Sequence, residues 1–215
     1  KMADAIAGAK NFLLVLSPGS LHSAINASVA RAAVNLAVLT GGKVLSLLRE
    51  GNAQGAMDMG ISPDFLPGYK ETATAQNGSG VPTIRQAMES GDIKALYLLG
   101  SDIQKEMALV GLPMETLRDL EFVVVQDVFG GPISELAHVV LPAASFAERE
   151  GSYTSAYRIV QGAEQVIKPL EQSRSDLEII SALGQRLGLA STESVEAARA
   201  QIAQQVPIYD FLQDP

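Results

Sequence analysis

Residues 122–142 read FVVVQDVFGGPISELAHVVLP, and this stretch decides the fold class. Its two apolar runs, residues 122–125 and 138–141, are short and rich in valine, so each is a predicted buried strand. A parallel crossover usually takes about a dozen residues or more, and residues 127–137 provide eleven. We therefore expect the two strands to be parallel and to be joined by a helix of only one or two turns.

Strands and helices alternate upstream of this stretch. The apolar runs 11–16, 43–48 and 94–99 are further predicted strands, and the alanine-rich run 20–39 is the longest predicted helix. Continuous apolar strands that alternate with helices are typical of a parallel sheet covered on both faces. The sequence thus predicts an α/β fold, a three-layer, Rossmann-like unit around one mostly parallel sheet of about five strands.

The C-terminal part of the chain is predicted to be helical. A Ser-x-x-Glu capping box begins at Ser175, and Gly188 is a typical helix stop. A second helix is expected over residues 193–205. We interpret residues 1–190 as one domain and residues 191–215 as a C-terminal helix and tail packed on it.

Composition and charge exclude several classes of protein. With 47% hydrophobic residues the chain is not intrinsically disordered, and a net charge of −8 would repel nucleic acid. The absence of cysteine excludes disulfides, thiolate nucleophiles and iron–sulfur ligation by this chain. The two histidines, His22 and His138, have no partner at ligand spacing, so no metal site is expected.

Neither a membrane helix nor a signal peptide is recognisable. The most apolar run, residues 21–39, carries Arg31 near its middle, where insertion costs about 2.5–3.5 kcal/mol. The start of the sequence has no basic segment followed by an apolar core. A cytoplasmic location is therefore expected.

The segment 60–81 differs from its surroundings because it is rich in proline, glycine and small polar residues. We interpret it as a flexible loop, with its highest mobility at residues 72–80, which have almost nothing to bury. Phe65, Leu66 and Pro67 are expected to stay anchored against the sheet.

Ligands of open α/β sheets bind in the crevice beyond the carboxyl ends of the strands. In this sequence the polar and glycine residues that follow two of the predicted strands are Gly100, Ser101, Asp102, Gln126 and Asp127. They are the candidate residues of a cofactor crevice.

Four other groupings suggest chemistry, but each has a more ordinary interpretation. They are the glycine-rich run 51–60, Ser20 with His22, Asp58 with Asp64, and Glu148 with Glu150. The first lacks both the phosphate-loop and the dinucleotide pattern, and a serine that opens a helix is usually its cap. The aspartates lack the spacing of a calcium loop, and the glutamates beside Arg149 suit a solvated turn. None is by itself a catalytic site.

Several segments together resemble a known family. Residues 51–60 (GNAQGAMDMG) with 66–69 (LPGY) are similar to the N-x-x-G-x-x-D-x-G…L-P-G stretch of molybdopterin oxidoreductases. Residues 95–102 (ALYLLGSD) resemble the strand and loop that ends G-x-N-P, and residues 122–150 resemble V-x-Q-D…A-D-V-V-L-P-A…E. Within this superfamily the resemblance is greatest to the large iron–sulfur subunit of bacterial NADH–quinone oxidoreductase, respiratory complex I. It covers residues 11–187 and implies the formate dehydrogenase/DMSO reductase type of α/β domain.

The departures from the family pattern fall where a pterin nucleotide would bind. His138 replaces the aspartate of A-D-V-V-L-P, and Ser101-Asp102-Ile103 replaces the end of G-x-N-P. In G-T-F-T-N-x-E-G-R-x-Q the asparagine becomes Ser155, and the Glu-Gly-Arg becomes Tyr157-Arg158-Ile159. The resemblance therefore implies a degenerate crevice without molybdopterin.

The resemblance implies a structural role rather than catalysis, with no catalytic or metal-binding residue in this chain. The expected function is a scaffold on the cytoplasmic side of the membrane that supports electron transfer from NADH to quinone. Its partners would be other domains of the same subunit, which would carry iron–sulfur clusters upstream, and neighbouring peripheral-arm subunits. Two alternatives remain: a fragment of a working molybdopterin oxidoreductase that binds the pterin nucleotide, and a Rossmann-like domain that binds another small ligand.

Overall fold

The computed structural model describes residues 1–16, 24–48, 50–62, 65–71, 81–100, 102–109, 111–192 and 194–213. The chain forms two compact units: unit 1 comprises Lys1–Ala56 and Tyr153–Gln161, and unit 2 comprises Met57–Ser152 and Gly162–Pro215. Within the described ranges, no helix is long and apolar enough to cross a bilayer.

Five of the predictions concern residues outside the described ranges. They are those for Ser20, His22, Asp64, Ser101 and the predicted mobile segment 72–80. These predictions stay predictions.

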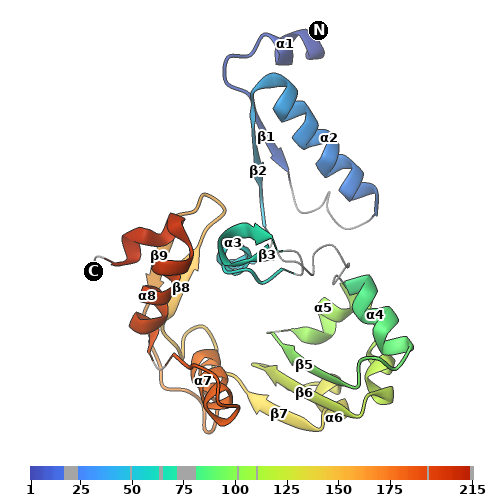
Figure 1. The fold of residues 1–215 in the computed structure, drawn as a ribbon, viewed down its shortest axis with the longest axis vertical. Coiled ribbons are helices and arrows are strands. Elements are labelled where there is room, and N and C mark those ends of the chain that lie inside the picture. Colours follow the sequence, from blue (N-terminus) through green and yellow to red (C-terminus); the bar gives the residue numbers. More distant parts are fainter. Residues whose placement is uncertain are drawn as a thin grey trace. The chain divides into compact units, whose positions relative to one another are not determined.

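Unit 1 is built on a parallel pair of strands and one long helix (Figure 1). Its elements are α1 (Met2–Ala7), β1 (Leu13–Leu16), α2 (Ala24–Thr40) and β2 (Lys43–Ser46). The two strands pair in parallel, with Leu13 opposite Lys43, and α2 contacts both strands. Gly41 follows the last residue of α2 in the left-handed region at φ 63°, where a side chain would be strained.

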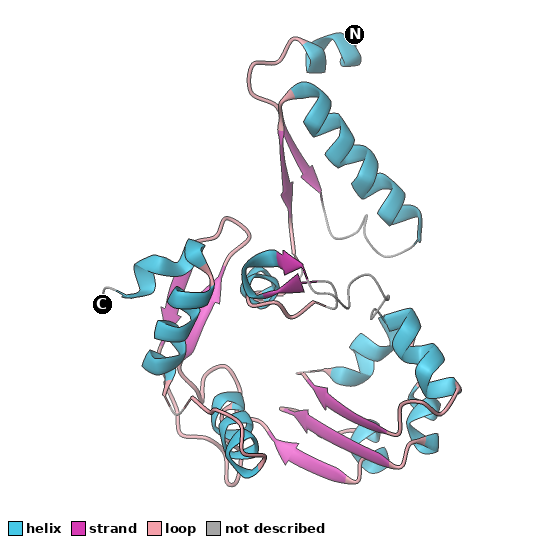
Figure 2. Cartoon of the chain, viewed as in Figure 1, coloured by secondary structure: helices cyan, strands magenta, loops and turns pink. Residues whose placement is uncertain are grey.

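Unit 2 contains a three-stranded parallel sheet in the order β5-β6-β7 (Figure 2). The strands are β5 (Ala95–Leu99), β6 (Phe122–Asp127) and β7 (Val139–Pro142), and the helices around them are α4 (Val81–Glu89), α5 (Ile103–Leu109), the 3-10 helix η4 (Met114–Asp119) and α6 (Pro132–Leu136). In the ladder, Tyr97 lies opposite Val124, and Gln126 lies opposite Leu141. The parallel pairing of β6 with β7 and the five-residue crossover helix α6 are both as expected.

One hydrophobic core supports this sheet. Val123 and Val125 of β6 are completely buried, and alternate residues of β5 pack on the same side. The helices contribute Met88, Ile103, Met107, Leu117 and Ile133 to this cluster. These five residues come from four helical elements, so the helices and the strands share one continuous core.

Short elements complete the chain. They are α3 (Ala53–Asp58), β3 (Phe65–Leu66), the 3-10 helix η2 (Pro67–Tyr69), β4 (Lys70–Glu71), β8 (Gly151–Thr154), β9 (Val160–Ala163), α7 (Asp176–Arg186), α8 (Val195–Gln205) and the 3-10 helix η5 (Pro207–Gln213). Strands β3 and β4 pair antiparallel, and β8 pairs with β9. The capping box of α7 is confirmed, since Ser175 accepts from the Glu178 N–H (3.2 Å) and the Glu178 carboxylate accepts from the Ser175 N–H (2.8 Å).

Three sequence-based expectations are wrong. The five predicted strands exist and are parallel to their partners, but they belong to two separate sheets rather than one. Alternation along the chain predicts the type of unit, whereas hydrogen bonding between strands decides which strands share a sheet. The segment 60–81 is not wholly irregular, because residues 65–71 form the β3-η2-β4 turn. Leu66 is half exposed rather than anchored.

Candidate cofactor crevice

The carboxyl ends of β5, β6 and β7 lie at the same edge of the unit 2 sheet, where the sequence predicts a crevice. Gly100 follows β5, and its N–H donates to the Gln126 carbonyl (3.1 Å). Asp102 is exposed, and its carboxylate lies 4.0 Å from the Lys105 amine. The structure therefore brings Gly100 against β6 and leaves Asp102 at the surface.

Asp127 is buried at the end of β6 and is used twice within the protein. One carboxylate oxygen accepts from the Ile103 N–H at the start of α5 (3.2 Å), and the other accepts from the Phe129 N–H (3.0 Å). A carboxylate at these positions stabilises both the helix start and the turn after the strand. Asp127 thus joins the loop after β6 to the helix after β5.

Gln126 is fully buried and is the centre of a chain of polar side chains. Its amide oxygen accepts from the Tyr97 hydroxyl, and its amide nitrogen donates to the Asp176 carboxylate (2.6 Å). Asp176, the first residue of α7, also pairs with the guanidinium of Arg149. Burial raises the pKa of the Tyr97 hydroxyl further above its ordinary value. This chain connects β5, β6, α7 and the 145–150 loop.

The glycine-rich run 51–60 begins with an anchor in unit 1. The Asn52 side-chain oxygen accepts from the Thr154 N–H of β8 (2.8 Å). Gly55 gives this amide its space, because a Cβ at Gly55 would lie 2.4 Å from the Asn52 oxygen. The asparagine and the first glycine of the N-x-x-G pattern therefore work together to hold β8.

The same run ends with an anchor in unit 2. Asp58 is completely buried, and its two carboxylate oxygens accept from the hydroxyls of Tyr69 and Tyr209, each at 2.8 Å. Gly60 then turns the backbone at φ 77°, and a Cβ there would lie 2.6 Å from the Pro67 nitrogen. The carboxylate considered for a cation with Asp64 is thus occupied by two tyrosines.

The pair Glu148 and Glu150, considered in the sequence as an acid and base, does not form such a site. Glu148 accepts from the N–H groups of Ser145 (2.8 Å) and Leu170 (2.9 Å), so it pins two loop segments together. The backbone and side-chain hydrogen bonds from Ser145, together with that from Leu170, lower the Glu148 pKa. A carboxylate that is ionised and accepts two hydrogen bonds is not suited to act as a general acid. Glu150 is exposed.

His138 stands where the family pattern has aspartate. Its Nδ1 accepts from the Val123 N–H (3.1 Å), and its ring lies 5.7 Å from that of Phe122. The histidine therefore lies at the amino end of β7 and holds it to β6, at the opposite end of the strand from the carboxyl edge.

The residues that replace N-x-E-G-R form the turn between β8 and β9. Ser155 N–H donates to the Ile159 carbonyl (3.0 Å), and Arg158 N–H donates back to the Ser155 carbonyl (2.8 Å). Tyr157 is 71% exposed and Ile159 60% exposed. This loop closes on itself instead of presenting the family's polar residues.

Comparison with known proteins now gives the family. Residues 1–186 match the family described as Molybdopterin oxidoreductase. The chain belongs to the molybdopterin oxidoreductase family. The resemblance found in the sequence is therefore confirmed at this level, and so is the α/β fold class with parallel strands.

The relatives are much longer than this chain. It is 30% identical over 227 residues to the NADPH-Fe(3+) oxidoreductase subunit alpha of Geobacter sulfurreducens, with 97% of this chain and 27% of that protein covered. It is 30% identical to formate dehydrogenase H of Escherichia coli, with 85% and 29% covered. The solved structure of acetylene hydratase from Pelobacter acetylenicus matches 59% of this chain and 17% of its own, with 23% identity and a TM-score of 0.42.

The hydrogen bonds of the crevice side chains decide how well a pterin nucleotide would fit there. Polar side chains of a binding site must have hydrogen-bonding groups left over for the ligand. Gln126 and Asp127 are buried and each make two hydrogen bonds within the protein, and among the described residues no three histidine or carboxylate side chains cluster as a metal site would. The described side chains at this edge fit a closed polar network better than a pterin.

Sequence reasoning found some of these groups and missed others. Gln126 and Asp127 were predicted at the right edge, and Asn52 and Asp58 lay inside a recognised motif, although their partners were not foreseen. Tyr209 was missed, because a tyrosine in a C-terminal segment outside the family match has no sequence signal.

Proposed function

We propose that this chain is a scaffolding domain of the large iron–sulfur subunit of a bacterial NADH–quinone oxidoreductase, complex I. In that role it supports electron transfer from NADH to quinone and carries no catalytic residue. The observation behind this proposal is that Gln126 and Asp127, at the centre of the crevice, are committed to hydrogen bonds within the protein. Such side chains stabilise a rigid edge of the sheet rather than a ligand.

The relatives give further support for a nicotinamide-linked electron-transfer enzyme. The Geobacter sulfurreducens protein, which this chain matches over almost its whole length, is named for oxidation of NADPH and reduction of Fe(3+). The chain spans about a quarter of that protein. We therefore place the iron–sulfur clusters on other parts of the same subunit, since this chain has no cysteine.

The proposed partners and location follow from the same role. The scaffold would contact other domains of its own subunit and neighbouring subunits of the peripheral arm, on the cytoplasmic side of the membrane. A net charge of −8 argues against nucleic acid as a further partner.

The alternative is a domain of a working molybdopterin oxidoreductase that holds the pterin nucleotide at the same edge. Its support is the family itself and the similarity to formate dehydrogenase H. In that case Gln126 and Asp127 would have to exchange their present partners for the nucleotide.

Cofactor analysis of the full-length protein separates the two functions. We expect iron and acid-labile sulfide, no stoichiometric molybdenum or tungsten, no extractable pterin, and NADH-dependent quinone reduction by the assembled complex. One pterin and one metal atom per chain, with formate oxidation and no response to NADH, would overturn the scaffold proposal. Variants Gln126→Ala and Asp127→Ala sharpen the result, because they would remove pterin from a binding domain.

A further inference from the structure

Strand β7 is an edge strand with a largely open outer side. It pairs with β6 along its whole length, and its outer side has one isolated bridge in the described residues, between Ala143 and Arg174 just past its end. Val139 and Val140 are 37% and 45% exposed. An exposed apolar edge strand is a template for another strand, so it is usually covered or protected.

One residue of the chain, Arg174, already pairs with the end of this edge. The Arg174 N–H donates to the Pro142 carbonyl (3.1 Å), and the Ala144 N–H donates to the Arg174 carbonyl (2.7 Å). Because this bridge is parallel, the residues that would continue it along β7 are 171–173; they line the same cleft as residues 140–142 but form no bridge with β7 in the described residues. The edge over residues 139–141 therefore has no strand partner on its outer side in the part of the chain that the structure describes. The outer side of β7 can therefore accept a parallel strand, because in the described residues only the carbonyl of its last residue, Pro142, has a backbone partner there.

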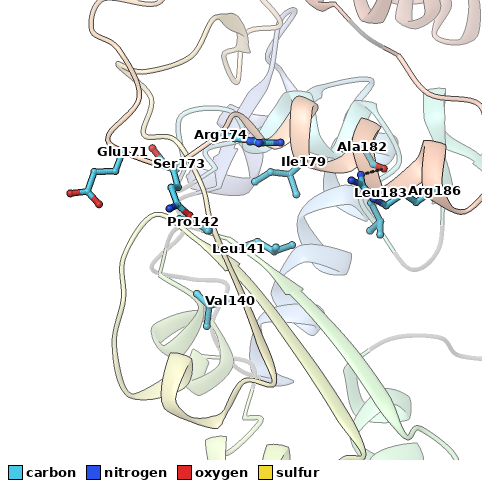
Figure 3. Close-up of a pocket in the computed structure, with 11 residues that line it drawn as sticks. Val140, Leu141, Pro142, Glu171, Ser173, Arg174, Ile179, Ala182, Leu183 and Arg186 are labelled. Carbon is cyan, nitrogen blue, oxygen red and sulfur yellow. Dashed lines mark hydrogen bonds between the residues drawn. The ribbon is translucent and has the colours of Figure 1, made fainter.

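A cleft of about 640 Å³ lies beside this open edge, between β7 and α7 (Figure 3). Val140 and Leu141 line it from the strand, and Ile179, Ala182 and Leu183 line it from the helix. These residues of β7 and α7 are apolar, whereas the segment 171–174 adds polar and charged side chains to the lining. An occupant must therefore bring apolar side chains as well as backbone hydrogen bonds.

Two arginines and one glutamate, Glu171, are among the residues that line this cleft. Neither Arg174 nor Arg186 forms an ion pair with a carboxylate in the described part of the chain, and Arg186 donates to the Ala182 carbonyl of its own helix (3.1 Å). The two guanidinium groups outnumber the single carboxylate among the lining residues, so the cleft carries net positive charge in a chain whose net charge is −8. They favour an anionic occupant.

We propose that this cleft is a docking site for an extended acidic segment of a partner protein. The segment adds a strand to the outer edge of β7, places apolar side chains between β7 and α7, and sets carboxylates against Arg174 and Arg186. The open edge specifies the extended backbone, and the arginines specify the acidic side chains.

The test uses the whole 215-residue chain and a displayed library of random twelve-residue peptides as the probe. Selected peptides are expected to combine alternating apolar residues with aspartate or glutamate. Their synthetic versions are then titrated by fluorescence polarisation against the natural chain, the Arg174→Glu/Arg186→Glu variant, and the matched control Arg118→Glu on η4. The cleft variant should bind at least about tenfold more weakly, and the control should bind unchanged.

A second measurement keeps the result independent of folding. Bound peptide should slow amide hydrogen exchange at Val139 and Leu141, and Arg174→Gln/Arg186→Gln, with circular dichroism like that of the natural chain, should weaken binding in the same direction. The proposal is overturned if the library yields no peptide, if selected peptides bind the natural chain and both double variants equally, or if the same arginines instead control dimerisation in light scattering.

Discussion

The two units follow the same strand–helix–strand pattern but bury very different amounts of apolar surface. Unit 2 surrounds Val123 and Val125 with helices and forms a continuous core. In the described part of unit 1 the buried apolar residues are Ala33 and Ala37, whereas Leu13 and Val15 of β1 are more than half exposed. A two-stranded sheet has too little area to enclose large side chains, so an α/β pattern alone does not make a stable core.

The largest effect should come from the core of unit 2. Leu117→Ala, at a side chain that is 1% exposed, should lower the free energy of unfolding of unit 2 by about 3–4 kcal/mol, because it opens a cavity. Leu13→Ala in unit 1, at a side chain that is 57% exposed, should change stability by less than about 0.5 kcal/mol. Urea-dependent hydrogen exchange, followed by mass spectrometry, resolves the two units. Equal losses would show that unit 1 has a core of its own.

Removing the hydrogen-bonding side chain at each end of the 51–60 run should again cost more stability in unit 2 than in unit 1. Asp58→Ala leaves two tyrosine hydroxyls in unit 2 without this acceptor, so it should cost about 3 kcal/mol. Asn52→Ala removes one hydrogen bond to Thr154 in unit 1 and should cost about 1 kcal/mol. The exposed Asp210→Ala serves as the control beside Tyr209. A larger loss for Asn52→Ala would reverse the comparison.

Two glycines with positive φ separate backbone strain from crowding. Gly60→Ala in unit 2 adds a clash with the Pro67 backbone to an unfavourable φ, and should cost about 2 kcal/mol or more. Gly41→Ala in unit 1 has open space around its Cβ position, so only the conformational cost of about 1 kcal/mol is expected. Thermal unfolding of both variants measures the difference, and indistinguishable melting temperatures would show that the turn at Gly60 relaxes freely.

The smallest expected effect is a dependence on pH in unit 2. Because hydrogen bonds lower the Glu148 pKa in the folded protein, its stabilisation is present above the unfolded value of about 4.5 and is lost as the pH falls through the lower folded value. Glu148→Gln should therefore flatten the fall in stability of unit 2 below about pH 4.5. Unfolding midpoints measured from neutral to acidic pH check this, with Glu150→Gln as the exposed control. A parallel fall in natural protein and Glu148→Gln would contradict it.

Several elements were predictable because the information is local. The runs at β6 and β7 and the short connection through α6 predicted a parallel pair, and the Ser175 capping box predicted the start of α7. Gly188 follows the end of α7 as expected, with a φ of 71°. In each case a few neighbouring residues determine the backbone conformation, so no distant contact is needed.

The candidate site was predictable only in part. The crevice residues Gln126 and Asp127 were placed at the correct edge, since the carboxyl ends of parallel strands meet there. Their partners Tyr97, Asp176 and Ile103 could not be assigned from sequence, because one buried amide or carboxylate has many possible donors along a chain. Whether such a residue binds a ligand or a neighbour depends on which groups the fold brings to it.

The sequence by itself determined the α/β class, the parallel direction of the strands, both ends of α7 and the family. These properties depend on hydrophobic periodicity, turn residues and motifs within short windows. The tertiary structure alone decided that the strands form two sheets and that Asp58 holds Tyr209, which is 151 residues away. It also decided that the crevice carboxylate and amide have protein partners. Such pairings depend on which distant segments meet when apolar surfaces are buried, and local sequence patterns carry no record of that choice.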